Sequence, residues 1–320
     1  MKKNLLKTAA FLALYIVFQA LISFATLPPT IKEMKSLLRK SVDVVYFGDS
    51  VITFWPDNEN DRESIVEKLQ KLAGKDYSVG GIHHAAYNVD IFYSFIKYMK
   101  SSRRLPRIIV VPINMATFSP EWMRPHFQFD LERSILENNN LFYDVFYRPA
   151  SIFSKGSISN IEYMNLDVYD GDKIEGKVSD YDNSSFSEYS EDKFAKKIVF
   201  RYMYKLDDKN PKVASVVKIL EMCEKENVNL IFYITPVDYN ACSFAVGRRF
   251  VENLGYNRSF LEKLITGKGA YFLDLSVSLT SEKFGWRQHS KYINEHMNSS
   301  GRAFVAAKID REIRRILNAK

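Results

Sequence analysis

The chain has 320 residues, of which 46% are hydrophobic, 26% charged and 14% aromatic, with 13 glycines, 10 prolines and two cysteines. This composition excludes collagen-like, disulfide-stapled and compositionally disordered proteins, and the length is ample for a sizeable core. The 45 basic residues exceed the 38 acidic ones and give a net charge of +7. Because such an excess invites a nucleic-acid interpretation, the distribution of the charge matters.

Part of the positive charge lies at the N-terminus, where lysines precede an uncharged run over residues 8–27 that is closed by Pro28 and Pro29. As a helix this run would be about 30 Å long, the thickness of a bilayer's hydrocarbon core. Basic residues before it hold that end in the cytoplasm, so the rest of the chain is expected outside. We favour a membrane anchor over residues 1–29. A cleaved signal peptide, with a small-x-small site at residues 23–25, and a buried core helix are the alternatives.

From residue 42 onward, short β-branched runs alternate with stretches of helical periodicity. Strands are predicted over 42–47, 77–79, 107–112, 229–234 and 271–275, and helices over 62–73, 89–100, 211–226, 248–265 and from Ser299 to the C-terminus. Strands joined by helices of this length form a parallel sheet that is covered on both faces. Although the length suggests about two domains, we predict one α/β sandwich over residues 30–320.

Residues 151–192 do not fit the alternation, because they are rich in Ser, Asp, Tyr, Gly and Asn and long for a loop inside a compact domain. Acidic residues concentrate in this predicted insertion, so the net positive charge belongs to the rest of the chain. Two interpretations stay open, a solvated surface excursion and a flap that covers substrate or binds a partner.

Cysteine and histidine usage predicts neither a metal site nor a cofactor. Cys223 and Cys242 have no CxxC spacing, and either two buried thiols or a disulfide would fit them. The adjacent His83 and His84 lack carboxylate or cysteine neighbours at ligand spacing. Because the basic residues are scattered rather than clustered with aromatics, we expect no nucleic-acid partner.

Polar residues follow the predicted strands at their carboxyl ends, where sheets of this type place ligands. A Gly-Asp-Ser tripeptide ending in Ser50 follows the first strand, Gly80 and Gly81 follow the second, Asn114 follows the third, and His296 precedes the last helix. Serine is a weak nucleophile until a base removes its proton, and histidine is suited to do so near neutral pH. Serine and glycine N–H groups and an asparagine amide can hold the developing oxyanion. The pattern therefore indicates acyl-transfer chemistry.

These ordered blocks resemble those of the SGNH hydrolase superfamily, also called GDSL-like esterases and acyltransferases. The similarity runs from about residue 42 to the C-terminus, and residues 112–122 resemble membrane-anchored members associated with bacterial surface-polysaccharide acylation. The resemblance implies a flavodoxin-like three-layer α/β/α fold that needs no cofactor. It also implies site roles, with Ser50 as nucleophile, His296 as general base, and the Ser50 N–H, the Gly81 N–H and Asn114 as oxyanion hole.

The acid that usually stands three residues before the histidine is replaced by Ile293. Glu295, next to the histidine, and Asp274, at the end of the last strand, are candidates for its role, although neither matches the motif. The glycine block is also loose, since Gly80 or the position of His84 could align with the donor in place of Gly81.

Two functional hypotheses follow. The first is a single-pass protein of the bacterial cell membrane whose extracytoplasmic domain is a serine esterase or O-acyltransferase for acyl, above all acetyl, esters of cell-surface or exported polysaccharide. The second is a catalytically degenerate module that binds glycan or partners a membrane O-acyltransferase. Trp122, Tyr87 and Phe54 either line a sugar-binding cleft or serve packing.

Overall fold

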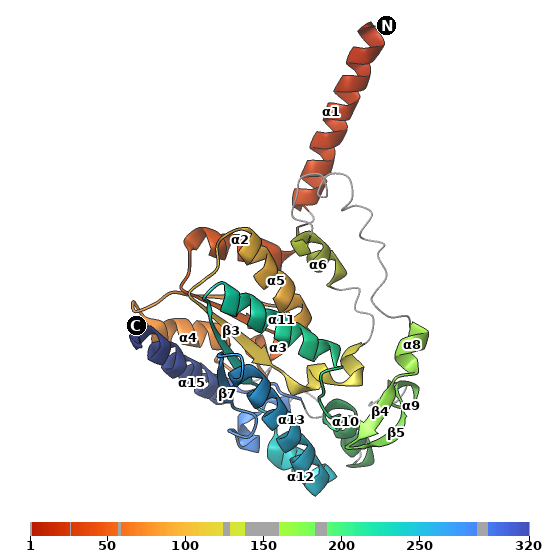
Figure 1. The fold of residues 1–320 in the computed structure, drawn as a ribbon, viewed down its shortest axis with the longest axis vertical. Helices are drawn as coiled ribbons and strands as arrows, with labels where there is room; N and C mark the ends of the chain where they lie inside the picture. Colours follow the sequence, from red (N-terminus) through yellow and green to blue (C-terminus); the bar gives the residue numbers. More distant parts are fainter. Residues whose placement is uncertain are drawn as a thin grey trace.

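The computed structural model describes residues 2–25, 27–56, 59–123, 129–137, 160–182, 191–286 and 294–319. Its centre is a five-stranded parallel sheet in the order β2-β1-β3-β6-β7 (Figure 1). The strands are β1 (Val44–Gly48), β2 (Val79–His83), β3 (Ile108–Ile113), β6 (Asn229–Ile234) and β7 (Tyr271–Asp274). This is the flavodoxin-like strand order, so the predicted fold class is confirmed.

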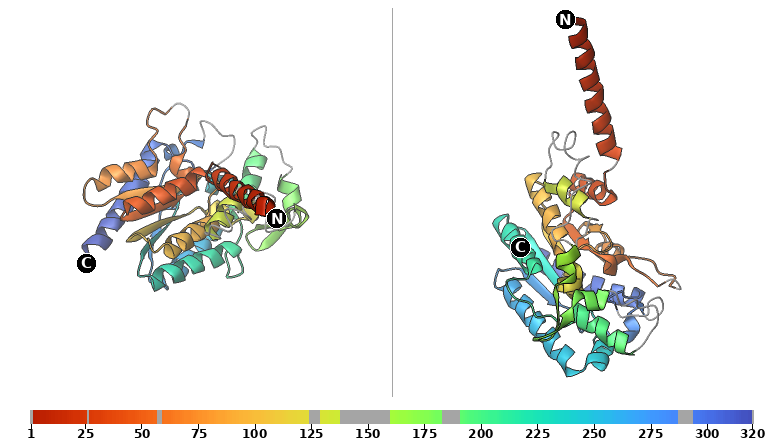
Figure 2. Two further views of the ribbon diagram at one scale, coloured as in Figure 1. Left: turned by 90° about the horizontal axis from the view of Figure 1, so that it is seen from above. Right: turned by 90° about the vertical axis from the view of Figure 1, so that its right-hand side faces the viewer.

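The strands are apolar on both faces because helices cover both faces. All residues of β1 and of β3 are buried. Helices α2 (Pro29–Lys40), α5 (Val89–Ser101) and α11 (Pro211–Lys225) lie side by side on one face, and α4 (Ile65–Ala73) packs with α15 (Ser299–Asn318) over the other (Figure 1, Figure 2). Continuous apolar strands are what such a doubly covered parallel sheet requires.

Gly80 and Gly81 lie inside β2 rather than after it. Neighbouring strand residues point to opposite faces, and here each glycine faces a helix. A Cβ on Gly80 would lie 2.4 Å from Leu37 of α2, and one on Gly81 would lie 3.1 Å from Val66 of α4. The glycines therefore let both helices approach the strand, which extends to His83 where the sequence pattern predicts an end at residue 79.

The remaining elements of the body are mostly short. Helix α13 (Arg248–Thr266) lies beside β7 and matches a predicted helix. The sequence pattern does not predict the following elements: α3 (Ser50–Thr53), η1 (Met115–Phe118), η2 (Pro120–Met123), α6 (Asp130–Glu137), α12 (Tyr239–Val246) and η4 (Ser281–Lys283).

Within the predicted insertion, residues 160–182 form a small folded unit. They comprise α8 (Asn160–Met164), an antiparallel hairpin of β4 (Asp167–Asp170) and β5 (Lys173–Lys177), and α9 (Val178–Asp182). Four of their side chains and Phe200 of α10 (Glu191–Tyr202) make a second apolar cluster, separate from the main core. The N–H of Gly171 in the hairpin turn donates to Met203 O at 2.8 Å, which fastens the hairpin to the body.

Helix α1 (Lys2–Ala25) projects from the body (Figure 1). Residues Asn4–Ile22 have a mean hydropathy of 2.0 and are 0% buried, and they are long and apolar enough to cross a membrane. An exposed helix of this kind does not fit the core-helix alternative. A membrane anchor and a signal sequence both fit it.

Candidate active site

The structure brings Ser50 and His296 together. Nε2 of His296 lies 3.0 Å from Oγ of Ser50. Ser50 begins α3 directly after β1, and His296 lies in the loop before α15, so two chain segments far apart in sequence meet at the carboxyl edge of the sheet. The distance is that of a hydrogen bond, the contact through which a general base takes up a serine proton.

The turn that presents Ser50 depends on the two residues before it. A Cβ on Gly48 would lie 1.5 Å from the side chain of Ile52, so α3 can fold back over the strand end only where there is no side chain. Oδ1 of Asp49 accepts from the N–H of Val51 at 2.9 Å and caps α3. The Gly-Asp pair therefore gives Ser50 its place at the edge of the sheet.

Asn114 lies at the end of β3, the strand next to β1. Its Oδ1 accepts from the N–H of Ala116 at 3.0 Å and caps η1, and its Nδ2 donates to Oδ2 of Asp49 at 2.9 Å. These two bonds fix the orientation of the amide. Nδ2 carries a second hydrogen, which can serve the oxyanion of a substrate bound at Ser50.

The carboxyl group of Asp49 is only 4% exposed, and its burial raises its pKa to about 6. The hydrogen bonds from Asn114 and Val51 oppose this rise, whereas the nearby carboxylate of Glu295 adds to it. The ionised group accepts both bonds, so Asp49 holds the Asn114 amide best at a pH above its pKa.

Gly81 is the predicted oxyanion donor that the structure does not bring to this edge. Gly81 pairs with Tyr46 in the body of the sheet, whereas Gly48, just before the nucleophile turn, is level with His83. The N–H of His84 donates to Gly48 O at 3.3 Å. The prediction of Gly81 as oxyanion donor is therefore corrected. Because β2 continues past the glycines to His83, the residue that bonds to the chain just before Ser50 is His84.

The two candidate acids are engaged with other partners. The buried carboxylate of Glu295 accepts from the hydroxyl of Tyr202. Asp274 pairs with Arg258 and accepts from the hydroxyl of Ser276 at 2.6 Å. Ile293, which replaces the usual acid, lies outside the described residues.

A feature that the sequence did not reveal is the aromatic stack on His296. The ring of Phe54 faces the imidazole with centroids 4.1 Å apart and planes inclined by 11°. The N–H of Phe54 donates to Ser50 O at 2.8 Å, so the stack is built on the turn that carries Ser50. The backbone of His296 is held as well, since its N–H donates to Asn294 Oδ1 at 3.0 Å and its carbonyl accepts from Gly285 N–H at 2.8 Å.

Tyr87 and the two cysteines, which the sequence also singled out, are buried side chains. The hydroxyl of Tyr87 donates to Thr30 at 2.8 Å, so this ring serves packing against α2. Cys223 and Cys242 are both buried and unpaired, and burial raises the pKa of the Cys223 thiol to about 12, which makes it unreactive. Across the described ranges, no three His, Cys, Asp or Glu side chains are grouped as metal ligands.

A cavity of about 500 Å³ opens beside η1, the short helix that follows Asn114. The hydroxyl of Tyr204 donates to Met115 O, and Nδ2 of Asn210 donates to Phe118 O at 3.1 Å, so one wall is tied directly to η1. The lining combines aromatic, acidic, basic and amide side chains, among them Phe118, Tyr169, Tyr204, Asp172, Asp207, Lys205, Lys209 and Asn210.

No protein-family model matches the chain, and no curated protein matches it. An acetylxylan esterase from Geobacillus stearothermophilus superposes with a TM-score of 0.39 at 11% identity, over 85% of this chain and 94% of the esterase. An α/β hydrolase enzyme from the metagenome of Lake Arreo, Spain, superposes with a TM-score of 0.39 at 9% identity, over 83% of this chain and 91% of the enzyme. Both superpositions are loose, and both identities are low.

Proposed function

We propose that the chain is a serine esterase or O-acyltransferase that works through an acyl-serine intermediate. The observation that carries this proposal is the 3.0 Å contact between His296 Nε2 and Ser50 Oγ at the carboxyl edge of the sheet. His296 takes the proton of Ser50 as Oγ attacks the ester carbonyl, and Asn114 and the Ser50 N–H hold the oxyanion. His296 then gives the proton to the leaving alcohol. In the second step water or a sugar hydroxyl attacks the acyl-serine and gives its proton to His296, which returns a proton to Ser50 Oγ as the bond between Oγ and the acyl group breaks.

The proposed substrate is an acyl, above all acetyl, ester of cell-surface or exported polysaccharide. The cavity beside η1 supports this class, because the C–H face of a sugar packs on aromatic rings while its hydroxyls bond to carboxylates and amides. Its volume lies in the range of small-ligand sites.

We place the enzyme on the outer side of a membrane, held by α1. The lysines before the apolar run support this orientation. A membrane O-acyltransferase that supplies or receives the acyl group is the proposed partner.

The test uses the full-length protein in detergent. We expect a fluorophosphonate probe to label Ser50, and we expect the protein to release p-nitrophenol from p-nitrophenyl acetate. Ser50→Ala should abolish labelling and lower kcat by a factor on the order of 10⁴ or more, whereas Ser36→Ala, at an exposed serine of α2, should leave both unchanged. An unlabelled wild-type protein, or a Ser50→Ala variant with the wild-type rate, would refute the proposal.

The second hypothesis, a degenerate glycan-binding module, is motivated by Ile293 at the position of the usual acid. It predicts a folded wild-type protein that the probe does not label. It also predicts that acetylated oligosaccharide binds equally well to wild type and to Ser50→Ala. The same labelling experiment therefore separates an enzyme from a binding module.

A further inference from the structure

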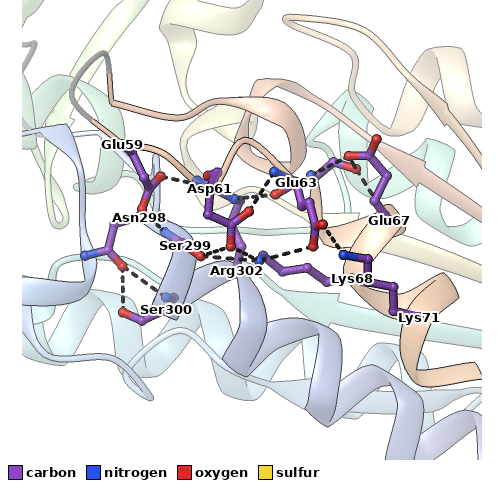
Figure 3. Close-up of polar contacts among 12 residues, drawn as sticks. Glu59, Asp61, Glu63, Glu67, Lys68, Lys71, Asn298, Ser299, Ser300 and Arg302 are labelled. Atoms are coloured by element: carbon purple, nitrogen blue, oxygen red, sulfur yellow. Dashed lines mark hydrogen bonds and ion pairs between the residues drawn. The ribbon is translucent and has the colours of Figure 1, made fainter.

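One buried arginine at the start of α15 joins the chain segment after α3 to the loop that carries His296 (Figure 3). The side chain of Arg302 is 0% exposed. Its guanidinium donates to five acceptors: Nε to Glu63 O at 2.8 Å, Nη1 to Phe54 O at 3.0 Å and Met297 O at 2.9 Å, and Nη2 to Glu59 Oε2 at 3.0 Å and Asp61 O at 2.7 Å. All five donor hydrogens of the group are thereby used.

The surroundings of Arg302 balance its charge and fasten the same two segments a second time. The carboxylate of Glu59 pairs with Arg302 and also accepts from the N–H of Ser299. Asp61 accepts from the Ser299 hydroxyl and pairs with Lys68 at 2.5 Å. Figure 3 shows these acidic side chains facing the first turn of α15. Moving either segment would leave the buried guanidinium without some of its acceptors, which is strongly unfavourable, so these bonds favour one spacing of the two segments.

The two carbonyl groups that accept from Nη1 of Arg302 connect it to the proposed active site. One is the carbonyl of Phe54, whose ring stacks on the imidazole, and the other is the carbonyl of Met297, the residue directly after His296. A single nitrogen therefore bridges the two backbones from which the stacked rings project.

We propose that Arg302 is a positioning residue for the reaction. By bridging Phe54 O and Met297 O it keeps the Phe54–His296 stack closed, and the closed stack keeps Nε2 of His296 aimed at Oγ of Ser50. Arg302 touches none of the reacting atoms. This inference rests on the proposed function, because orientation of the base matters only where His296 serves Ser50.

The test is Arg302→Lys in the full-length protein. Lysine keeps the charge, but its three donors do not form the planar fork that bridges two carbonyls and a carboxylate. We expect kcat for p-nitrophenyl acetate and the rate of fluorophosphonate labelling to fall together by about 10- to 100-fold, with KM nearly unchanged, because a small misplacement of the base has effects of this size.

Arg314→Lys is the matched control. Arg314 lies on the same helix and likewise binds a backbone carbonyl, that of Leu72 at 2.7 Å, together with the carboxylates of Asp310 and Asp76. It is remote in sequence from the loop of His296. Arg314→Lys should therefore lower thermal stability while leaving kcat within about twofold of the wild type.

A double-mutant cycle with Phe54→Leu separates positioning from general loosening of the fold. Because Arg302 acts through the stack, Arg302→Lys should have little further effect on kcat in a Phe54→Leu background. Fully multiplicative effects of the two changes would overturn the proposal, and so would a folded Arg302→Lys variant with the wild-type kcat.

If Arg302→Lys does not fold, Glu59→Gln is the variant that tests the proposal. This change removes the charge partner of Arg302 but leaves the guanidinium in place. A loss of kcat that disappears in the Phe54→Leu background supports the proposal, and an unchanged kcat overturns it. A wild-type protein that neither labels nor turns over would instead refute the proposed function itself, so the two failures are distinguishable.

Discussion

A single buried carboxylate, that of Asp49, links the turn that carries Ser50 to the amide that is proposed to hold the oxyanion. One of its oxygens caps α3 through Val51, and the other receives the Nδ2 of Asn114. The ionisation of one residue therefore bears on two parts of the site at once.

Asp49→Asn should change how stability depends on pH. The folded-state pKa of Asp49 is raised to about 6 from an ordinary value of 3.8, so the folded protein holds this proton more tightly than the unfolded chain does. Ionisation of Asp49 therefore disfavours the folded state, and stability is lost as the pH rises from about 4 to about 6, by up to about 3 kcal/mol. The free energy of unfolding, measured in urea at several pH values, should show this loss in the wild type but not in Asp49→Asn.

Asp172→Asn is the control for that measurement, since Asp172 is 77% exposed. Its pH slope should match that of the wild type. An Asp49→Asn variant whose slope also matches the wild type would contradict the assigned role of Asp49. In the same variant the Asn114 amide loses its anionic acceptor, so kcat should fall as well.

At the residue scale, the sequence predicted the side chains whose chemistry is local. Ser50, Asn114 and His296 each stand next to a strand or helix end that periodicity makes visible. The stack of Phe54 on His296 and the hydrogen bonds of Arg302 could not be found in the same way, because they depend on segments that only the folded chain brings together. No spacing rule links residues so far apart.

At the scale of elements, the alternation of strand-like and helical stretches in the sequence predicted the sheet, but it did not predict where β2 ends. The sequence treats a glycine pair as a breaker, but in the structure Gly80 and Gly81 are places where helices pack closely on a strand. Because β2 extends to His83, Gly81, the expected oxyanion donor, lies within the sheet and not at the end of the strand. The folded unit at residues 160–182 also escaped prediction, because its strands are short and mostly exposed and its apolar cluster is small.

The hairpin of β4 and β5 should matter for long substrates only. Tyr169 of β4 is 36% exposed and lines the cavity beside η1. Tyr169→Ala should raise KM for an acetylated oligosaccharide by about 10-fold, the effect of losing one stacking contact, and leave p-nitrophenyl acetate hydrolysis unchanged. Ile161→Ala, at an exposed residue of α8 that does not line the cavity, is the control. Equal KM values of Tyr169→Ala and wild type for the oligosaccharide would show that the cavity does not bind this substrate.

At the scale of the whole molecule, α1 and α2 have separate roles. The apolar run of α1 is exposed, whereas Ile31 and Met34 of α2 are 0% exposed in the main core. A chain that begins at Leu27 should therefore stay folded and leave the membrane fraction, whereas a chain that begins at Ser41 should lose several kcal/mol of stability, about 2 to 5 for each large core side chain removed.

Fractionation and thermal melting of the two truncated chains check this expectation. An undiminished melting temperature of the chain that begins at Ser41 would show that α2 is dispensable. Retention of the Leu27 truncation in the membrane fraction would show that another surface binds the bilayer.

The connection between α1 and α2 bears on the reach of the proposed active site. Leu27 and Pro28 are buried, and Thr30 is already bonded to Tyr87 of the body, so the chain is held by the body from Leu27 onward. A long Gly/Ser-rich tether would let Ser50 sample a wide volume at low effective concentration. In the proposed function, with α1 in a bilayer, Ser50 instead works near one height above the lipid, and the sugar units within its reach are set by how far a glycan chain extends from its own point of attachment.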